Sequence, residues 1–219
     1  MKTTAIILSA GKGKRMNSDI SKQYIMLEGY PLIYHTIKAF EDSEVDNIVL
    51  VAGKDEIEFC KTDIISRYDF KKVRCVTAGG KERYNSVYEG LKAIENNKID
   101  TDIVLVHDGA RAFVNDKIIH DSISYAHEFG AAVAAVKAKD TIKLVCENGF
   151  VKDTPDRNFL WQIQTPQTFL MKSLKKAYDL ALDSNDEDIT DDSMIMERYG
   201  DTDIKVFEAS YDNIKVTTP

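Results

Sequence analysis

The segment AIILSAGKGKRM, residues 5–16, is the stretch that decides the fold class, because an apolar strand runs directly into a loop with two glycines and three cations. Gly11 and Gly13 lack a Cβ, so the backbone can adopt positive φ and its N–H groups can approach an anion. Arg15 and the later Lys22 add positive charge. The loop lacks the Gly-Lys-Ser/Thr ending of a Walker A loop and the third glycine of a dinucleotide fingerprint. The segment therefore predicts either a phosphate-binding loop or an ordinary glycine turn between a strand and a helix.

Outward from this segment, short apolar runs alternate with helical patterns, which is typical of parallel strands joined by crossover helices. The expected strands are Thr4–Leu8, Ile48–Ala52, Val73–Thr77, Ile103–His107, Ala131–Val136 and Ile204–Phe207, with an extended piece at Asn213–Thr217. The expected helices are Pro31–Phe40, Ser86–Ile94, Asp116–Phe129, Lys172–Leu182 and Asp192–Tyr199. Several strands are continuous apolar runs, which predicts burial on both faces. The fold class is α/β, with a Rossmann-like, mostly parallel sheet flanked by helices.

The alternation breaks at TIKLVCENGFVKDT, residues 141–154, where two extended runs flank Asn148-Gly149. Asn-Gly between strands is a strong hairpin signal, since both residues tolerate the positive φ of a type I′ turn. A hairpin that projects from the sheet needs a cover for its edge. Either a partner subunit covers it or it folds back on its own domain. We expect one domain over residues 1–219, with a protruding β-hairpin arm at 141–157 as a dimerisation element.

Composition excludes several classes of protein. With 219 residues, 43% of them hydrophobic and 30% charged, the chain has the profile of a globular domain. A net charge of −7 argues against general binding to nucleic acid or anionic membranes. The sequence contains neither an apolar run of membrane-spanning length nor the pattern of a signal peptide. We expect a cytoplasmic protein with no nucleic-acid or membrane partner.

The cysteines and histidines do not indicate a metal centre or a nucleophile. Three cysteines lie at wide, irregular spacing and four histidines form no metal-ligand pattern. A Gly-x-Ser-x-Gly elbow is absent from the sequence. We therefore expect no dedicated protein-only metal site and no covalent catalysis.

Polar clusters follow several of the expected strands, at the edge where doubly wound sheets bind ligands. In AGGKERYNS, residues 78–86, the two glycines leave backbone groups free to contact a planar base, and Arg83 and Ser86 add directional hydrogen bonds. The alternative is a glycine turn with a helix N-cap. Further clusters are HDGAR, residues 107–111, and KDTIK, residues 139–143.

Asp108 and Arg111 have two interpretations. Asp108 can accept from a ribose hydroxyl or lie beside a phosphate-bound Mg²⁺, while Arg111 offers a planar fork for phosphate. Alternatively the two form a salt bridge that shapes the loop. Sites that hold anions and neutralise charge are typical of phosphoryl and nucleotidyl transfer. Lys215 alone is indistinguishable from a solvated strand lysine.

Eight motifs in order resemble the 2-C-methyl-D-erythritol 4-phosphate cytidylyltransferases over nearly the whole chain. They are AGKGKRM, KQY with LEGYPLIYHT, GGKERYNSV, VHDGAR, KDTIK, RNFLWQIQTPQTF, ITDDSMIME and NIKVTTP. The resemblance implies a homodimer clasped by hairpin arms and a reaction that depends on Mg²⁺ or another divalent cation. In that reaction, the phosphate of methylerythritol phosphate attacks the α-phosphorus of CTP, which gives 4-diphosphocytidyl-2-C-methylerythritol and pyrophosphate. The CTP phosphates would hold the Mg²⁺.

The resemblance also implies roles for individual residues. The catalytic residues would be Arg15, Lys22 and Lys215. The CTP-binding residues would be Ala10, Gly11, Gly13, Gly80, Lys81, Arg83, Ser86 and Asp108. The residues that bind the acceptor would be Asp108, Arg111, Thr141, Arg157 and Thr190, and among them Arg157 and Thr190 would reach the pocket of the other subunit.

The chain departs from the family pattern at Gly109 and Ala112, where alanine and proline are usual, and these changes are expected to loosen the loop that carries Asp108. The ribitol-5-phosphate cytidylyltransferases of cell-wall polymer synthesis have almost the same CTP loops. Thr141-Ile142-Lys143 favours the methylerythritol enzyme. A nucleotide-sensing protein without turnover is the third interpretation.

Overall fold

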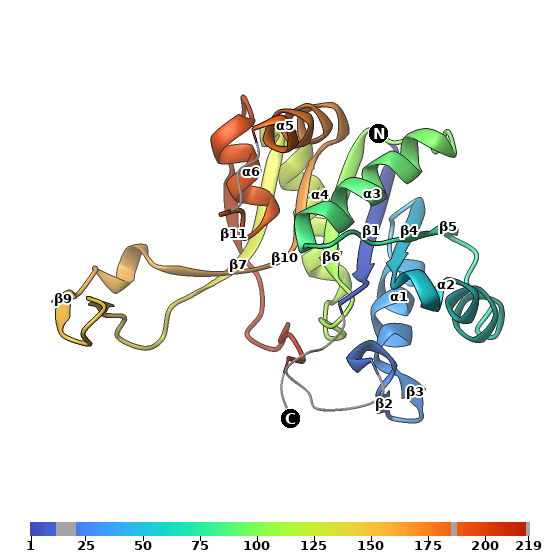
Figure 1. Ribbon diagram of the computed structural model, residues 1–219, viewed down its shortest axis with the longest axis horizontal. Coiled ribbons are helices and arrows are strands. Elements are labelled where there is room, and N and C mark those ends of the chain that lie inside the picture. The colour runs from blue at the N-terminus through green and yellow to red at the C-terminus, as the bar shows by residue number, and fades with distance from the viewer. Residues whose placement is uncertain (12–20, 185–187, 218–219) are drawn as a thin grey trace.

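The computed structural model describes residues 1–11, 21–184 and 188–217, and its centre is a seven-stranded sheet with the order β11-β7-β10-β6-β1-β4-β5 (Figure 1). The strands are β1 (Thr3–Ser9), β4 (Asn47–Ala52), β5 (Val73–Ala78), β6 (Ile103–Asp108), β7 (Ala131–Lys137), β10 (Trp161–Leu170) and β11 (Lys205–Glu208). Strand β10 runs antiparallel to both of its neighbours, whereas the other paired strands of this sheet are parallel. The predicted α/β class with a mostly parallel sheet is confirmed.

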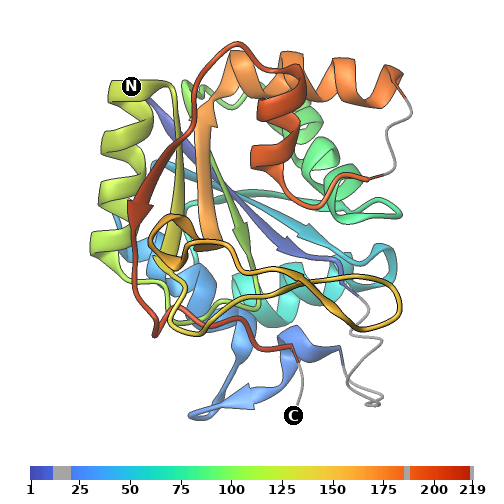
Figure 2. The same ribbon diagram turned by 90° about the vertical axis from the view of Figure 1, so that its left-hand side faces the viewer.

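Helices cover both faces of the sheet (Figure 2). The longer ones are α1 (Leu32–Asp42), α3 (Arg83–Asn96), α4 (Asp116–Phe129), α5 (Met171–Asp183) and α6 (Asp192–Tyr199). One core contains side chains of α1 and α4 with Ala5 and Ile7, and the other contains side chains of α3, α5 and α6 with Ile6. Successive side chains of a strand point to opposite faces. A continuous apolar run such as that of β1 is therefore what two cores require.

Local signals explain where α4 begins and ends. The side chain of Asn115 accepts a hydrogen bond of 3.0 Å from the backbone N–H of Ile118, which caps the first turn. Gly130 ends the helix at φ +87°, a conformation that side chains disfavour. The chain then enters β7 directly, so these two residues determine how α4 lies against the sheet.

Strand β10 is the strand of the central sheet that the sequence patterns do not predict. Its sequence, WQIQTPQTFL, has a proline at its centre, and proline is normally excluded from central strands because it lacks an N–H donor. The structure accommodates Pro166 with a cis peptide bond after Thr165, where the pairing with β7 shifts register between Ile163 and Gln167. The second half of the strand, Gln167–Leu170, pairs with β6.

Residues 141–157 leave the sheet as an arm (Figure 1). Its strands β8 (Leu144–Val145) and β9 (Val151–Asp153) pair antiparallel, and Gly149 takes the positive φ expected of an Asn-Gly turn. Between half and about 70% of each apolar side chain at Leu144, Val145 and Phe150 is exposed. The hairpin is confirmed, and the alternative in which it folds back on its own domain is wrong, because its apolar side chains stay uncovered.

Two shorter segments complete the frame of the site. The first is a 3₁₀ turn, η1 (Lys22–Tyr24), which precedes α1 in the chain. The second is a run of short helical turns over residues 54–66, including α2 (Ile57–Phe59), which follows β4. The predicted extended piece Asn213–Thr217 forms no strand, but the N–H of Val216 donates to the carbonyl of Ala110 at 2.9 Å. Within the described residues, no helix is long and apolar enough to cross a membrane.

Candidate active site

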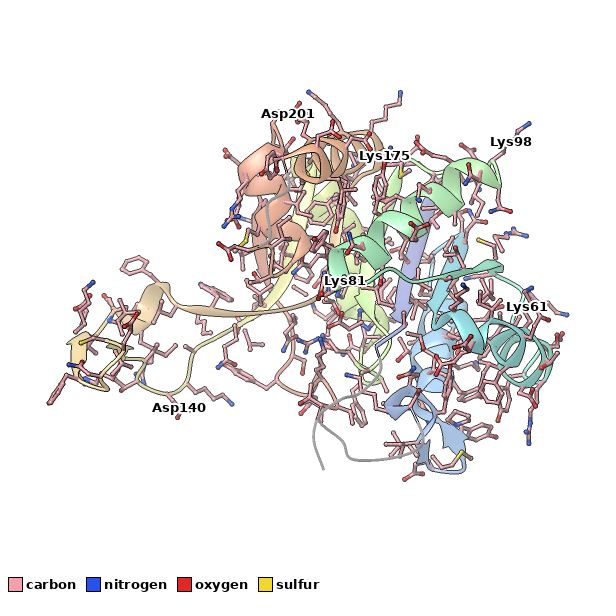
Figure 3. All side chains as sticks on the ribbon, in the orientation of Figure 1. Lys61, Lys81, Lys98, Asp140, Lys175 and Asp201 are labelled. Atoms are coloured by element: carbon pink, nitrogen blue, oxygen red, sulfur yellow. The ribbon has the colours of Figure 1, made fainter. Side chains whose placement is uncertain are left out.

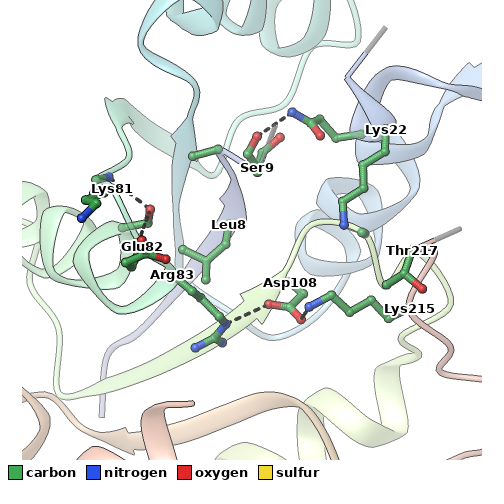
Figure 4. A pocket seen from close by; sticks show the side chains of 15 residues that line it. Leu8, Ser9, Lys22, Lys81, Glu82, Arg83, Asp108, Lys215 and Thr217 are labelled. Atoms are coloured by element: carbon green, nitrogen blue, oxygen red, sulfur yellow. Dashed lines mark hydrogen bonds and ion pairs between the residues drawn. The ribbon is translucent and has the colours of Figure 1, made fainter. Parts of the chain in front are cut away.

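A cavity of about 740 Å³ opens at the carboxyl ends of β1, β5 and β6 (Figure 4). Parallel strands present their carboxyl ends at one edge, so the loops that follow them converge there. The cavity is lined by Leu8, Ser9, Ala10, Gly11, Lys22, Gln23, Gly80, Lys81, Glu82, Arg83, Ser86, Asp108, Ala110, Lys215 and Thr217. Loops from both ends of the chain therefore form one pocket.

Most of the predicted CTP-binding and catalytic residues lie together in this pocket. They are Ala10, Gly11, Lys22, Gly80, Lys81, Arg83, Ser86, Asp108 and Lys215. Gly13 and Arg15 lie outside the described residues. Arg111, Thr141, Arg157 and Thr190 are not among the residues that line it.

Asp108, the last residue of β6, is the charged centre of the pocket. Its Oδ1 lies 3.3 Å from Nε of Arg83, and its Oδ2 lies 2.7 Å from Nζ of Lys215 and 4.0 Å from Nε of Arg111. Burial opposes ionisation of this carboxylate, but the charges of Arg83 and Lys215, with a smaller contribution from Arg111, hold its pKa well below the usual range. Even when the second carboxylate that pairs with Arg83, that of Asp192, is counted, three cations face two anions. This excess positive charge attracts an anionic ligand.

The salt bridge between Asp108 and Arg111 exists, but it is the longest of the three contacts. Nη1 of Arg111 instead donates at 2.7 Å to the carbonyl of Asn213. The amide of Asn213 is fully buried and donates to Oε1 of Gln164 at 3.0 Å and to the carbonyl of Thr165 at 2.9 Å. These bonds hold the segment that carries Lys215 against the sheet. Lys215 is therefore a pocket residue, and the interpretation as a solvated strand lysine is wrong.

Arg83 is held from its other side by Asp192, a residue that sequence reasoning missed. Nη1 of Arg83 lies 2.8 Å from Oδ2 of Asp192, whose other oxygen accepts from the hydroxyl of Tyr178. Asp192 is fully buried at the start of α6. It lies within the ITDDSMIME motif, but no local pattern indicates that it faces a residue 109 positions away. The two carboxylates fix the plane of the guanidinium at the pocket wall.

The loop after β5 packs closely. A Cβ on Gly79 would lie 2.4 Å from Cβ of Ala10, and one on Gly80 would lie 2.4 Å from Cβ of Asn85. The N–H of Gly79 donates to the carbonyl of Ala52, and that of Gly80 donates to Oγ of Ser86. The expectation that these N–H groups are free for a base is wrong, since donors at a strand end find partners in the fold. Glycine at these two positions lets the backbone of the loop approach Ala10 and Asn85 closely.

The turn that carries Lys22 is anchored to β1. Nε2 of the buried Gln23 donates to the carbonyl of Ser9 at 2.8 Å. Figure 4 shows the side chain of Lys22 reaching toward Thr217 and Lys215. Two lysines from opposite ends of the chain therefore face the same space.

Behind the pocket, His107 is completely buried in β6. The N–H of Asp108 donates to Oγ1 of Thr165, so the hydroxyl proton of Thr165 is available to Nδ1 of His107, 3.1 Å away. Nε2 then carries the proton and donates to the carbonyl of Arg111 at 3.1 Å. Burial lowers the pKa of His107 to about 4. The imidazole is neutral and positions the backbone on either side of Asp108.

This lowered pKa predicts a loss of stability in mild acid. The pKa of His107 is about 4 in the folded protein and about 6.5 in the unfolded chain, so the unfolded chain binds the proton first as the pH falls. The contribution of His107 to the free energy of unfolding is fully present above pH 6.5 and decreases below it. From pH 7 to pH 5 we expect it to lower the free energy of unfolding by about 2 kcal/mol. Urea unfolding of the wild type and of His107→Gln at both pH values measures this difference.

The exposed His127 supplies the control for that experiment, since His127→Gln removes a histidine without changing a buried one. We expect His127→Gln to keep the pH dependence of the wild type and His107→Gln to lose part of it. Equal pH dependence in all three proteins would contradict a neutral, buried His107.

Gly109, which stands where the family pattern usually has alanine, lies in a closely packed environment. A Cβ there would lie 2.8 Å from both the carbonyl oxygen of Leu8 and Cδ1 of Ile33. The N–H of Gly109 donates to that same Leu8 oxygen at 2.8 Å, and its carbonyl accepts from the hydroxyl of Thr36 at 2.9 Å. Ala112 is also buried. Glycine at position 109 therefore lies in a closely packed loop, and the loosening expected from the two changes stays a prediction.

The residues predicted to bind the acceptor mostly lie away from this pocket. Nη1 of Arg157 donates to the carbonyl of Lys139 at the root of the arm, and Thr141 and Thr190 are exposed. In Figure 3, Asp140 lies out along the arm and Lys81 lies at the pocket. The fold does not bring Thr141, Arg157 and Thr190 to the pocket of their own chain.

Among the described residues, no group of three His, Cys, Asp or Glu side chains comes together that could hold a metal ion. The pocket offers one buried carboxylate, several cations and a closely packed glycine loop at the carboxyl edge of an α/β sheet. This combination defines the class of nucleotide-binding α/β proteins that includes the nucleotidyltransferases.

Comparison with known proteins identifies the family. The family model described as IspD, 2-C-methyl-D-erythritol 4-phosphate cytidylyltransferase, matches residues 3–219. Proteins of that name from Clostridium novyi (strain NT) and Alkaliphilus oremlandii (strain OhILAs) are 48% and 49% identical over all 219 residues of this chain, which correspond to 92% and 91% of those proteins. The chain belongs to the 2-C-methyl-D-erythritol 4-phosphate cytidylyltransferase family.

Solved structures agree with this assignment. The 4-diphosphocytidyl-2C-methyl-D-erythritol synthase of Anaerococcus prevotii superimposes with a TM-score of 0.86 at 34% identity, covering 99% of this chain and 91% of that one. The 2-C-methyl-D-erythritol 4-phosphate cytidylyltransferase of Francisella tularensis has a TM-score of 0.80 at 32% identity, covering 100% and 95%. The recognised family and the predicted fold are both confirmed.

Proposed function

We propose that this protein transfers the cytidylyl group of CTP to 2-C-methyl-D-erythritol 4-phosphate and releases pyrophosphate. The observation that carries the proposal is the convergence of Lys22 and Lys215 on one pocket whose floor holds Asp108 and Arg83. Family membership supports CTP and the methylerythritol phosphate as the two substrates.

In the proposed reaction, a phosphate oxygen of the acceptor attacks the α-phosphorus of CTP and the bond from this phosphorus to the pyrophosphate oxygen breaks. Negative charge grows on the oxygens of the α-phosphate as the transition state forms. Lys22 and Lys215 supply positive charge that is already in place when it grows, which is the main way proteins accelerate such reactions. The ion pair with Asp108, 2.7 Å long, directs the ammonium group of Lys215 into the pocket.

A divalent cation, Mg²⁺ or another, fits this site as a companion of the nucleotide. Mg²⁺ in phosphoryl-transfer sites is commonly bound by one or two carboxylates together with substrate phosphates. Asp108 is the buried carboxylate of the pocket and already faces three cations, so the triphosphate would supply most of the ligands. The ion, when bound, neutralises charge on the phosphates.

The proposal includes a homodimer in which the arm of one chain reaches the pocket of the other. The exposed apolar side chains of the arm support a protein cover, since a contiguous exposed apolar patch marks an interaction surface. Arg157 on the arm, together with Thr190 in the segment before α6, would then act on the acceptor in the partner's pocket. A cytoplasmic location and the absence of nucleic-acid and membrane partners stay predictions.

The test is Mg²⁺-dependent pyrophosphate release from CTP, measured in parallel with methylerythritol phosphate and with ribitol 5-phosphate. We expect release with the first acceptor and little with the second. Release with ribitol 5-phosphate alone would move the protein to CDP-ribitol synthesis. CTP binding without release from either acceptor would indicate a nucleotide sensor.

A further inference from the structure

The carboxylate of Glu56 lies outside the pocket lining, yet it accepts hydrogen bonds from four groups. Its Oε1 accepts from the hydroxyl of Ser21 at 2.6 Å. Its Oε2 accepts from the hydroxyl of Tyr24 at 3.1 Å, from Nε2 of Gln23 at 3.3 Å and from the N–H of Gly53 at 3.2 Å. Two of these donors, Ser21 and Gln23, are the sequence neighbours of Lys22, and Tyr24 is two residues after it.

A cap for the short helix after β4 explains only one of these bonds. The N–H of Gly53 is the local donor, three residues before Glu56, as in a helix N-terminus. The other donors are 32 to 35 residues away and belong to the turn at the pocket. Since a cap needs no long-range partners, the carboxylate has a second role.

The close approach of Gly53 makes this arrangement possible. A Cβ on Gly53 would lie 2.7 Å from Oε2 of Glu56, so a side chain there would displace the carboxylate. The glycine at the end of β4 lets Glu56 turn back toward the turn that carries Lys22.

We propose that Glu56 is a positioning residue that fixes the turn Ser21–Tyr24 and thereby aims Lys22 at the reacting phosphate. The turn is a single 3₁₀ turn with no side-chain cap of its own, so its orientation depends on these outside contacts. Gln23 adds a bond to the carbonyl of Ser9, and Tyr24 contacts Cys60 and the ring of Phe59. A long lysine side chain transmits a small rotation of its backbone into a large displacement of the ammonium group.

This inference rests on the proposed function, and the experiment separates the two. Pyrophosphate release by the wild type tests the function alone. If the wild type is active, Glu56→Ala is expected to lower kcat on the order of 10–100-fold, as displacement of a catalytic group does, with little change in CTP affinity. The paired variant Ser21→Ala with Tyr24→Phe removes two of the donors, leaves Glu56 in place and is expected to lower kcat by a smaller factor.

A double-mutant cycle that combines Glu56→Ala with Lys22→Ala distinguishes positioning of Lys22 from a loss of the folded structure. If Glu56 acts through Lys22, then Glu56→Ala changes the single-turnover rate by less than about twofold when Lys22 is already alanine. The proposal is overturned if Glu56→Ala lowers the single-turnover rate by the same factor with Lys22 present and with Lys22 replaced by alanine. A wild-type kcat in Glu56→Ala overturns it as well. The matched control is Glu58→Gln, two residues along, whose exposed carboxylate pairs with Lys61. Urea unfolding of each variant shows whether it is folded.

Discussion

Lys22→Ala is expected to lower kcat for pyrophosphate release on the order of 10²–10³-fold, because one preorganised positive charge is removed from the transition state. Binding of CTP is expected to weaken less than about tenfold, since charge on the α-phosphate grows during the reaction and other cations of the pocket still hold the ground state. Steady-state kinetics gives kcat, and titration calorimetry with CTP gives the dissociation constant.

The control for this result is Lys61→Ala, which removes an exposed lysine from the outer surface of the helical turns after β4 (Figure 3). It is expected to behave as the wild type. A Lys22→Ala protein with near-normal kcat would remove Lys22 from the mechanism. An equal loss in affinity and turnover would reduce its role to ordinary substrate binding.

Arg157→Ala is expected to abolish most activity in the proposed homodimer, and a mixed dimer with a chain altered only at Lys22 is expected to regain it. The guanidinium of Arg157 lies at the arm and contacts the Lys139 carbonyl, away from the pocket of its own chain. If the arm serves the partner, the mixed dimer has one site with both residues intact. Such a dimer should have about half of the wild-type activity.

Co-expression with two different tags isolates the mixed dimers for this assay. The control pairs Lys22→Ala with Lys215→Ala, which line the same pocket of one chain, so neither site of that dimer is intact. We expect the mixed dimer of Lys22→Ala with Arg157→Ala to recover activity and the mixed dimer of Lys22→Ala with Lys215→Ala to recover none. No recovered activity in confirmed mixed dimers would count against a site shared between subunits.

The predicted site residues differ in how well local sequence located them. Lys22, Gly80, Arg83 and Asp108 each follow or lie near an apolar strand, and the shared edge of a parallel sheet is enough to bring such loops together. Lys215 has no such signal. It reaches the pocket because buried Asn213 ties its segment to Gln164 and Thr165, which local periodicity does not reveal.

The sequence by itself determined the α/β class and the strand-to-loop positions of most pocket residues, because burial on both faces requires continuous apolar runs. Only the tertiary structure decided that β10 enters between β6 and β7 despite Pro166, that Asp192 meets Arg83, and that Glu56 meets the turn of Lys22. Hydrophobic periodicity is a property of neighbouring residues. These three features join residues far apart in the chain, and only the order of strands and the packing of helices bring them into contact.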